Sequence, residues 1–331
     1  MDKENGCFEQ QVFAVKHKDR DVLLKSSSGG AFTALSDAIL DQKGVVIGSR
    51  YNYESQQMEF SICHTKEERN QLRGSKYIQS NMRGAFSLVD QLKTEGKANL
   101  PILFVGTPCQ GAALRNYLFY KKIDMPSLYV CDIICHGVAS YRFWKEHIEL
   151  MQRKHKGKVT YVSFKDKRNG WIYPSTIVQI NGKEYSISSF AQLFISNNIL
   201  RPSCYHCQYA SMERISDITI GDYWGIEKVH KEFFDPLGVS LMLVNTSKGR
   251  DVFDKAKKDF DYIQTSRKEC LQPNLIGPTL KPDEREQFWG EYREKGIWSI
   301  CKKYTDVTVR YKVKRKIKNV VYKFRKEKYE G

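Results

Sequence analysis

Four cysteines of this chain have neighbours that suit a ligand role. Cys109 lies in a Gly-Thr-Pro-Cys-Gln segment, Cys135 in Cys-His-Gly, and Cys204 and Cys207 form a Cys-x-x-Cys pair. Iron–sulfur clusters take four cysteine thiolates, because soft sulfur matches iron and the negative charges balance the cluster. Zinc accepts the same ligands, and simple packing also accounts for buried cysteines. Spacing alone leaves these three interpretations open, since the fold must first gather three distant segments.

Two alternatives to a cluster follow from the same residues. A zinc-stabilised binding protein would use Cys204 and Cys207 with ligands such as His136 or His206. Alternatively, Cys109 near a helix N-terminus would have a lowered thiol pKa and act as a nucleophile. Pro-Cys-Gln after a strand is also the nucleophile signature of DNA cytosine-5 methyltransferases. The Phe-x-Gly-x-Gly loop and Glu-Asn-Val element of those enzymes are not found in this sequence, so this DNA-modifying alternative is the weaker one.

The segments that carry the cysteines alternate between strand and helix patterns. Pro108 fits the first position of a helix, and both Cys109 and Cys135 follow predicted strands, at the edge where ligands of open α/β sheets collect. The fold class predicted is α/β, a mixed sheet flanked by helices, with a C-terminal basic helical extension. Strands are predicted over residues 10–17, 44–48, 58–64, 102–106, 127–134, 159–164, 176–180 and 239–244, with a strand and turn over 217–225. Helices are predicted over 31–40, 66–72, 82–92, 142–154, 191–200 and 248–258.

Size and cysteine usage indicate the compartment. The 331 residues can bury a full core without staples. Nine cysteines are an odd number and too few for a disulfide scaffold, and the sequence starts with no secretory pattern. We therefore expect a cytoplasmic protein with free thiols. No stretch reaches the roughly 18 apolar residues of a membrane-spanning helix.

Positive charge is concentrated at the C-terminal end. Residues 302–331 hold 12 Lys or Arg and 3 Asp or Glu, so 12 minus 3 places +9 of the net +16 there. The rest of the chain is mildly basic, and no nucleic acid partner is expected. Val313, Ile317, Val320 and Phe324 form an apolar stripe at helical spacing. The pattern predicts a cationic amphipathic helix that packs on the body, docks on an acidic redox partner or contacts the inner face of a membrane peripherally.

Seven motifs in order resemble one family, that of the coenzyme F420 hydrogenase/dehydrogenase beta subunits. The resemblance runs over about residues 10–250 and rests on the ordered set, because each motif alone is weak. It implies an FAD-binding α/β protein with a 4Fe-4S cluster, in which the flavin exchanges a hydride with a deazaflavin or another two-electron donor. The motifs are Ser27 to Gly30, Gly74 to Tyr77, Gly106 to Gln110, Cys135 to Gly137, Phe164 to Lys167 with Gly170-Trp171, Cys204 to Cys207, and Asp217 to Trp224.

The resemblance assigns roles at matching positions. It implies that Cys109, Cys135, Cys204 and Cys207 are the cluster ligands. It also implies an N-terminal flavin-binding region over residues 1–100 and an iron–sulfur and flavin region over 101–265, before the helical basic extension over 266–331. Many relatives carry a fused ferredoxin module, so a separate ferredoxin-like protein is the expected redox partner here. Compact relatives near polysaccharide genes suggest a role in polysaccharide biosynthesis.

Two loops and two further residues are expected to bind the flavin. Ser27, Ser28, Gly29 and Gly30 precede a predicted helix, whose free amides and dipole suit a pyrophosphate. Gly74 and Ser75 lead to Lys76, a cation that would stabilise the reduced ring, and Tyr77, which would stack or hydrogen-bond there. Lys76 and Tyr77 are the predicted catalytic residues. Lys165 would meet the phosphates or an anionic substrate, with a solvated charged hairpin end as the alternative. Asp222 would orient the ribityl chain or cap a turn.

Overall fold

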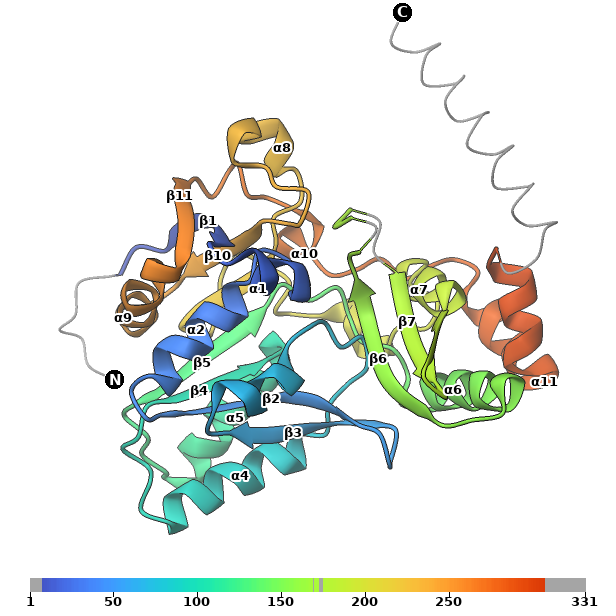
Figure 1. Cartoon of the computed structure of the whole chain (residues 1–331), viewed down its shortest axis with the longest axis horizontal. Coiled ribbons are helices and arrows are strands. Elements are labelled where there is room, and N and C mark those ends of the chain that lie inside the picture. The colour runs from blue at the N-terminus through green and yellow to red at the C-terminus, as the bar shows by residue number, and fades with distance from the viewer. Residues whose placement is uncertain (1–7, 169, 173–174, 307–331) are drawn as a thin grey trace, which may run out of the picture.

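The computed structural model describes residues 8–168, 170–172 and 175–306, and within them the strands form two sheets. The large sheet has the order β11-β1-β10-β9-β5-β4-β2-β3, and the small sheet has the order β6-β7-β8. The two lie beside each other in Figure 1. The strands are β1 (Gln11–His17), β2 (Val45–Asn52), β3 (Gln57–Cys63), β4 (Ile102–Gly106), β5 (Leu128–Ile133), β6 (Val159–Asp166), β7 (Ser175–Ile180), β8 (Lys183–Ser186), β9 (Ile218–Asp222), β10 (Ser240–Val244) and β11 (Phe260–Thr265).

Helices connect the strands and cover both faces of the large sheet. One face packs on α2 and α9, and the other packs on α4 and α5 at the β2–β5 end. The α-helices of the described residues are α1 (Arg20–Lys25), α2 (Ala31–Leu40), α3 (Lys66–Arg69), α4 (Met82–Thr94), α5 (Pro108–Lys121), α6 (Tyr141–His155), α7 (Ser188–Ile195), α8 (Ile226–Val229), α9 (Ser247–Ala256), α10 (Pro273–Ile276) and α11 (Arg285–Tyr304). The predicted fold class, a mixed α/β sheet flanked by helices, is confirmed.

The apolar runs of the sequence are explained by burial on both faces. In β1, Val12 and Ala14 point to one core cluster while Phe13 and Val15 point to another. Successive side chains of a strand alternate between faces, so a strand covered on both sides needs an unbroken apolar run. The same alternation places Leu103 of β4 against α2 and its neighbours on the α4 side.

Four adjacent strands of the large sheet run parallel, and their carboxyl ends meet at one edge. Strands β2, β4, β5 and β9 pair in parallel, whereas β1, β3, β10 and β11 join antiparallel. At the shared edge, β4 leads into α5 with Pro108 at its first position, as predicted. The Thr107 amide donates to Gln110 Oε1 at 2.9 Å, which closes this helix start.

The small sheet packs with α6, α7 and α11 around a separate aromatic core (Figure 1). Two details differ from the sequence prediction. The helix expected over 191–200 is α7 and ends at Ile195, because Asn197 adopts a left-handed φ of 67° that a helix cannot contain. Strands β8 and β11 were not predicted from the sequence. The amphipathic pattern at 313–324 lies outside the described residues.

The helices of the described residues are all too short or too polar to cross a membrane.

Candidate active site

A cavity of about 220 Å³ lies at the carboxyl edge of the parallel strands. The ends of β4, β5 and β9 form one wall, through Gly106, Ile133 and Gly221. Most of the residues predicted to bind a flavin line this cavity, although their segments are far apart in the chain. They are Ser27, Ser28, Gly30, Gly74, Ser75, Lys76 and Asp222. Gly29, Tyr77 and Lys165 are not part of its lining.

The serine–glycine loop is fixed tightly to the sheet. The Gly29 amide donates to Ser240 Oγ at 2.8 Å, and its carbonyl accepts from the His17 amide at 2.8 Å. A Cβ atom on Gly29 would lie 2.4 Å from both Ser240 N and Val15 O, so only glycine allows this approach. Gly30 follows with a φ of 82° and caps α2. The loop therefore presents the amino end of a ten-residue helix to the cavity.

The second predicted loop is hydrogen-bonded to the first. The Ser75 amide donates to Ser27 Oγ at 2.7 Å. Lys76 Nζ donates to the carbonyl oxygens of Arg73 at 2.9 Å and Gly74 at 3.1 Å, and also to that of Leu72. Burial lowers the pKa of Lys76 to about 7, against a raising effect of Cys63. The cation is thus held by neutral oxygens at the cavity wall.

Tyr77 points away from this cavity. Its ring stacks on Phe194 with centroids 4.3 Å apart, and it meets Phe164 edge-on. Burial, with a smaller effect of Asp222, raises the pKa of the Tyr77 hydroxyl. In this arrangement Tyr77 belongs to the aromatic core of the small sheet rather than to the wall of the cavity.

Lys165 and Asp222 form an ion pair between the two sheets. Lys165 Nζ donates to the two carboxylate oxygens of Asp222 at 2.5 and 2.6 Å, and Trp171 Nε1 donates to the same carboxylate at 2.6 Å. Trp171 stacks on Trp224 at 4.9 Å with an interplanar angle of 6°. Asp222 reaches the cavity, whereas the Lys165 side chain is 3% exposed and already neutralised. Lys165 and Asp222 were each predicted from the sequence to be binding residues, but their ion pair with each other was not predicted.

The four predicted ligand cysteines gather beside the cavity. Burial raises the pKa of Cys135 to about 12, and the proximity of Cys109, Cys204 and Cys207 contributes in the same direction. The Arg201 amide donates to the Val138 carbonyl at 3.0 Å, which ties the Cys-x-x-Cys segment to the chain after Cys135. The expected convergence of three distant segments is therefore present in the fold.

The thiols are near one another without a closed coordination shell. Among the described residues, no group of three or more His, Cys, Asp or Glu side chains is arranged to hold a metal ion. His136 is hydrogen-bonded through Nε2 to Asn197 Oδ1 at 2.7 Å, so its ring is already engaged. Four thiols from three segments remain a donor set whose chemistry fits an iron–sulfur cluster.

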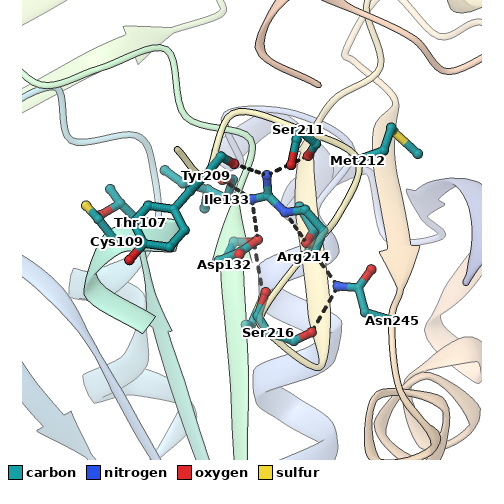
Figure 2. Close-up of polar contacts among 12 residues, drawn as sticks. Thr107, Cys109, Asp132, Ile133, Tyr209, Ser211, Met212, Arg214, Ser216 and Asn245 are labelled. Atoms are coloured by element: carbon teal, nitrogen blue, oxygen red, sulfur yellow. Dashed lines mark hydrogen bonds and ion pairs between the residues drawn. The ribbon is translucent and has the colours of Figure 1, made fainter. Parts of the chain in front are cut away.

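Arg214 connects two of the three segments that carry the cysteines, and it was not among the site residues predicted from the sequence. It donates to Asp132 Oδ1 at 2.7 Å, and Figure 2 shows its guanidinium between β5 and the loop that follows Cys207. It also donates to Thr219 Oγ1 at 3.1 Å and to the carbonyls of Tyr209, Ser211 and Ile133. The sequence signal for this ion pair is Asp132 itself, which stands within an apolar strand. A buried carboxylate there needs a cationic partner.

Comparison with known proteins agrees with this fold. Residues 101–269, just over half of the chain, match the family described as the C terminus of the coenzyme F420 hydrogenase/dehydrogenase beta subunit. The chain is 22% identical to the F420-dependent formate dehydrogenase subunit beta of Methanocaldococcus jannaschii, over 87% of this chain and 73% of the relative. A chain of the xenon-derivatised F420-reducing [NiFe] hydrogenase complex from Methanosarcina barkeri has the same fold, with a TM-score of 0.56 and 19% identity over 82% of this chain and 87% of that chain.

The mixed α/β sheet of this chain has the same fold as a chain of that hydrogenase complex. The chain belongs to the coenzyme F420 hydrogenase/dehydrogenase beta-subunit family and is an oxidoreductase.

Proposed function

We propose that this protein is a flavin- and iron–sulfur-dependent oxidoreductase with FAD in the carboxyl-edge cavity and a 4Fe-4S cluster at Cys109, Cys135, Cys204 and Cys207. The observation that carries the proposal is the adjacency of the two sites. Gly106 and Thr107 line the cavity and lead directly to Cys109, and Ile134 lines it directly before Cys135. The carboxyl ends of the neighbouring strands β4 and β5 therefore contribute residues to both proposed sites.

In this proposal the residues of the cavity bind FAD and orient it. The amides of Ser27, Ser28 and Gly30 and the amino end of α2 favour the negative charge of a pyrophosphate. Lys76 places its ammonium group at the cavity wall, where this group stabilises the flavin ring as the ring gains negative charge. The Asp222 carboxylate faces the cavity and would accept hydrogen bonds from hydroxyl groups of the ligand. Lys165 fixes the orientation of this carboxylate. Bound FAD would supply the exchange between hydride and single-electron chemistry, and the cluster would carry single electrons.

The donor and acceptor are proposed from the relatives. Their names include coenzyme F420, so a deazaflavin is the first candidate for the two-electron donor, with other hydride donors as the alternative. They are named as a subunit and as part of a complex, which supports a separate ferredoxin-like or other redox protein as partner. The polysaccharide setting, the three-region division at residues 100 and 265, and membrane contact through residues 302–331 stay predictions.

An anaerobic preparation distinguishes the candidate functions. We expect an absorption spectrum with flavin bands and a broad iron–sulfur shoulder, and extraction should yield FAD, iron and sulfide. A zinc-stabilised binding protein would instead hold about one zinc per chain and no iron. A DNA-modifying enzyme using Cys109 would bind S-adenosylmethionine. A protein without flavin, iron or sulfide after anaerobic purification would disprove the proposal.

A further inference from the structure

A groove of about 700 Å³ lies between β3, at the edge of the large sheet, and the start of α11. It shares residues 79–80 with the cavity at the carboxyl edge. One of its walls is formed by residues 200–202, which lead into Cys204, and the Cys204 amide donates to the Arg201 carbonyl at 2.9 Å. A molecule bound in this groove would therefore lie against the Cys-x-x-Cys segment.

The groove carries more positive than negative charge. Its cations are Arg201, Arg285 and Arg293, and its acid is Glu286. Glu286 already has a cationic partner outside the groove, because Lys281 Nζ lies 2.9 Å from its carboxylate. Arg201 and Arg293 are exposed, and neither forms a salt bridge within the part of the chain that the structure describes. The groove therefore offers charge that nothing in the described chain neutralises.

Neutral groups fix the position of Arg285. Its guanidinium donates to Tyr205 Oη at 2.9 Å and to the Leu200 carbonyl at 3.1 Å. The guanidinium also lies over the rings of Tyr205, at 5.2 Å, and Trp289, at 5.6 Å. Glu286 is 3.9 Å away, too far for a hydrogen bond. An acidic group that enters the groove would therefore meet a cation that is already oriented.

The lining of the groove also suits a peptide chain. Gln79 Oε1 is buried and has no hydrogen-bond partner among the described residues. A backbone N–H of a bound segment would satisfy this acceptor, and a buried acceptor without a partner costs free energy. Tyr141 and Trp289 line the groove together with the arginines. Trp, Tyr and Arg are the side chains that contribute most to protein–protein binding, so the groove has the composition of a protein interface.

We propose that this groove binds an acidic segment of the protein that exchanges single electrons with this chain. The excess of arginine selects an acidic segment, because complementary charge steers association and disfavours other partners. The place of the groove gives the partner its role, since a protein seated there lies beside Cys204, one of the proposed cluster ligands. The electron-transfer role rests on the proposed function, whereas the binding of an acidic segment does not.

Calorimetric titration of the anaerobically purified whole protein tests the proposal with two probes, an oxidised plant-type ferredoxin, which is a small acidic electron carrier, and the peptide N-acetyl-hexaglutamate. We expect saturable binding of the ferredoxin and its displacement by the peptide. Arg201→Gln and Arg293→Gln should each weaken ferredoxin binding by about three- to tenfold, through the loss of one charged contact, and leave the iron content unchanged. Both side chains are exposed, so the variants should fold. Arg153→Gln, likewise exposed but outside the groove, should bind as the wild type does.

Three results would overturn the inference. The first is the absence of ferredoxin binding, even if the peptide binds, because the arginines would then form a site for small anions. The second is wild-type affinity in both arginine variants. The third is ferredoxin binding that the peptide does not displace, because the ferredoxin would then lie elsewhere. Arginine-dependent ferredoxin binding by a protein that contains neither iron nor flavin would support the groove while removing the proposed function.

Discussion

Arg214 and Asp132 form an ion pair of 2.7 Å in which each side chain is only 1% exposed. Arg214 belongs to the loop that follows Cys207, and Asp132 lies on β5 shortly before Cys135. The pair therefore fixes the relative position of two of the three segments that carry the proposed cluster ligands (Figure 2). This buried ion pair fixes where the loop that follows Cys207 lies along β5.

Replacing Arg214 by methionine should destabilise the protein strongly. Asp132 would remain buried without its cation, at a cost of about 3–5 kcal/mol in the free energy of unfolding. Urea denaturation measures the change. Arg142→Met is a matched control, because the Arg142 side chain is exposed on α6 and its pair with Glu146 contributes little to stability. Equal stability losses in the two variants would contradict the role assigned to Arg214.

Serine replacement at Cys204 or Cys207 should lower the iron content of anaerobically purified protein to a small fraction of the wild-type value. A serine hydroxyl replaces a soft thiolate poorly as a ligand of iron. Iron and sulfide analysis per chain measures the effect. Cys63→Ser removes a thiol that lies elsewhere, buried at the end of β3, and should retain iron. Full iron in both Cys204→Ser and Cys207→Ser would exclude this pair from the site.

Gly29→Ala should lower both stability and flavin content. The new Cβ would lie 2.4 Å from Ser240 N and Val15 O, so the loop must move off the sheet. We expect a loss of at least about 2 kcal/mol, in the range of overpacked sites, and a loss of bound flavin measured by absorbance. In contrast, Gly290→Ala on α11 meets nothing within 4 Å and should add about 0.5–1 kcal/mol. A Gly29→Ala protein with wild-type stability would show that the close approach is not required.

The strand and helix pattern predicted from sequence matched the fold closely where periodicity was strong. Helix α2 begins and ends where expected, and Pro108 starts α5 as predicted. Strand ends placed Cys109 and Cys135 at one edge because β4 and β5 are parallel neighbours. Local signals suffice for such features, since propensity, capping and hydrophobic alternation all act over a few residues.

Long-range pairings could not be predicted in the same way. Nothing near Lys165 indicates that its ammonium is taken by Asp222, 57 residues later, rather than by a ligand. Tyr77 lies beside Lys76 in sequence, yet it stacks on Phe194 and does not line the cavity. The Arg214 contacts with β5 depend on the sheet order. Such features are set by tertiary packing, which a single sequence does not display.

The position of β1 has a consequence for how the chain folds. Strand β1 lies between β10 and β11, so the first strand of the described residues pairs with two strands more than 220 residues later. During synthesis, residues 11–17 have no sheet partner until the chain beyond residue 240 has left the ribosome. Pairings this distant in sequence form slowly, because a long loop must close before they gain contacts. The antiparallel side of the sheet, and with it the anchoring of Gly29, should therefore be completed late in folding.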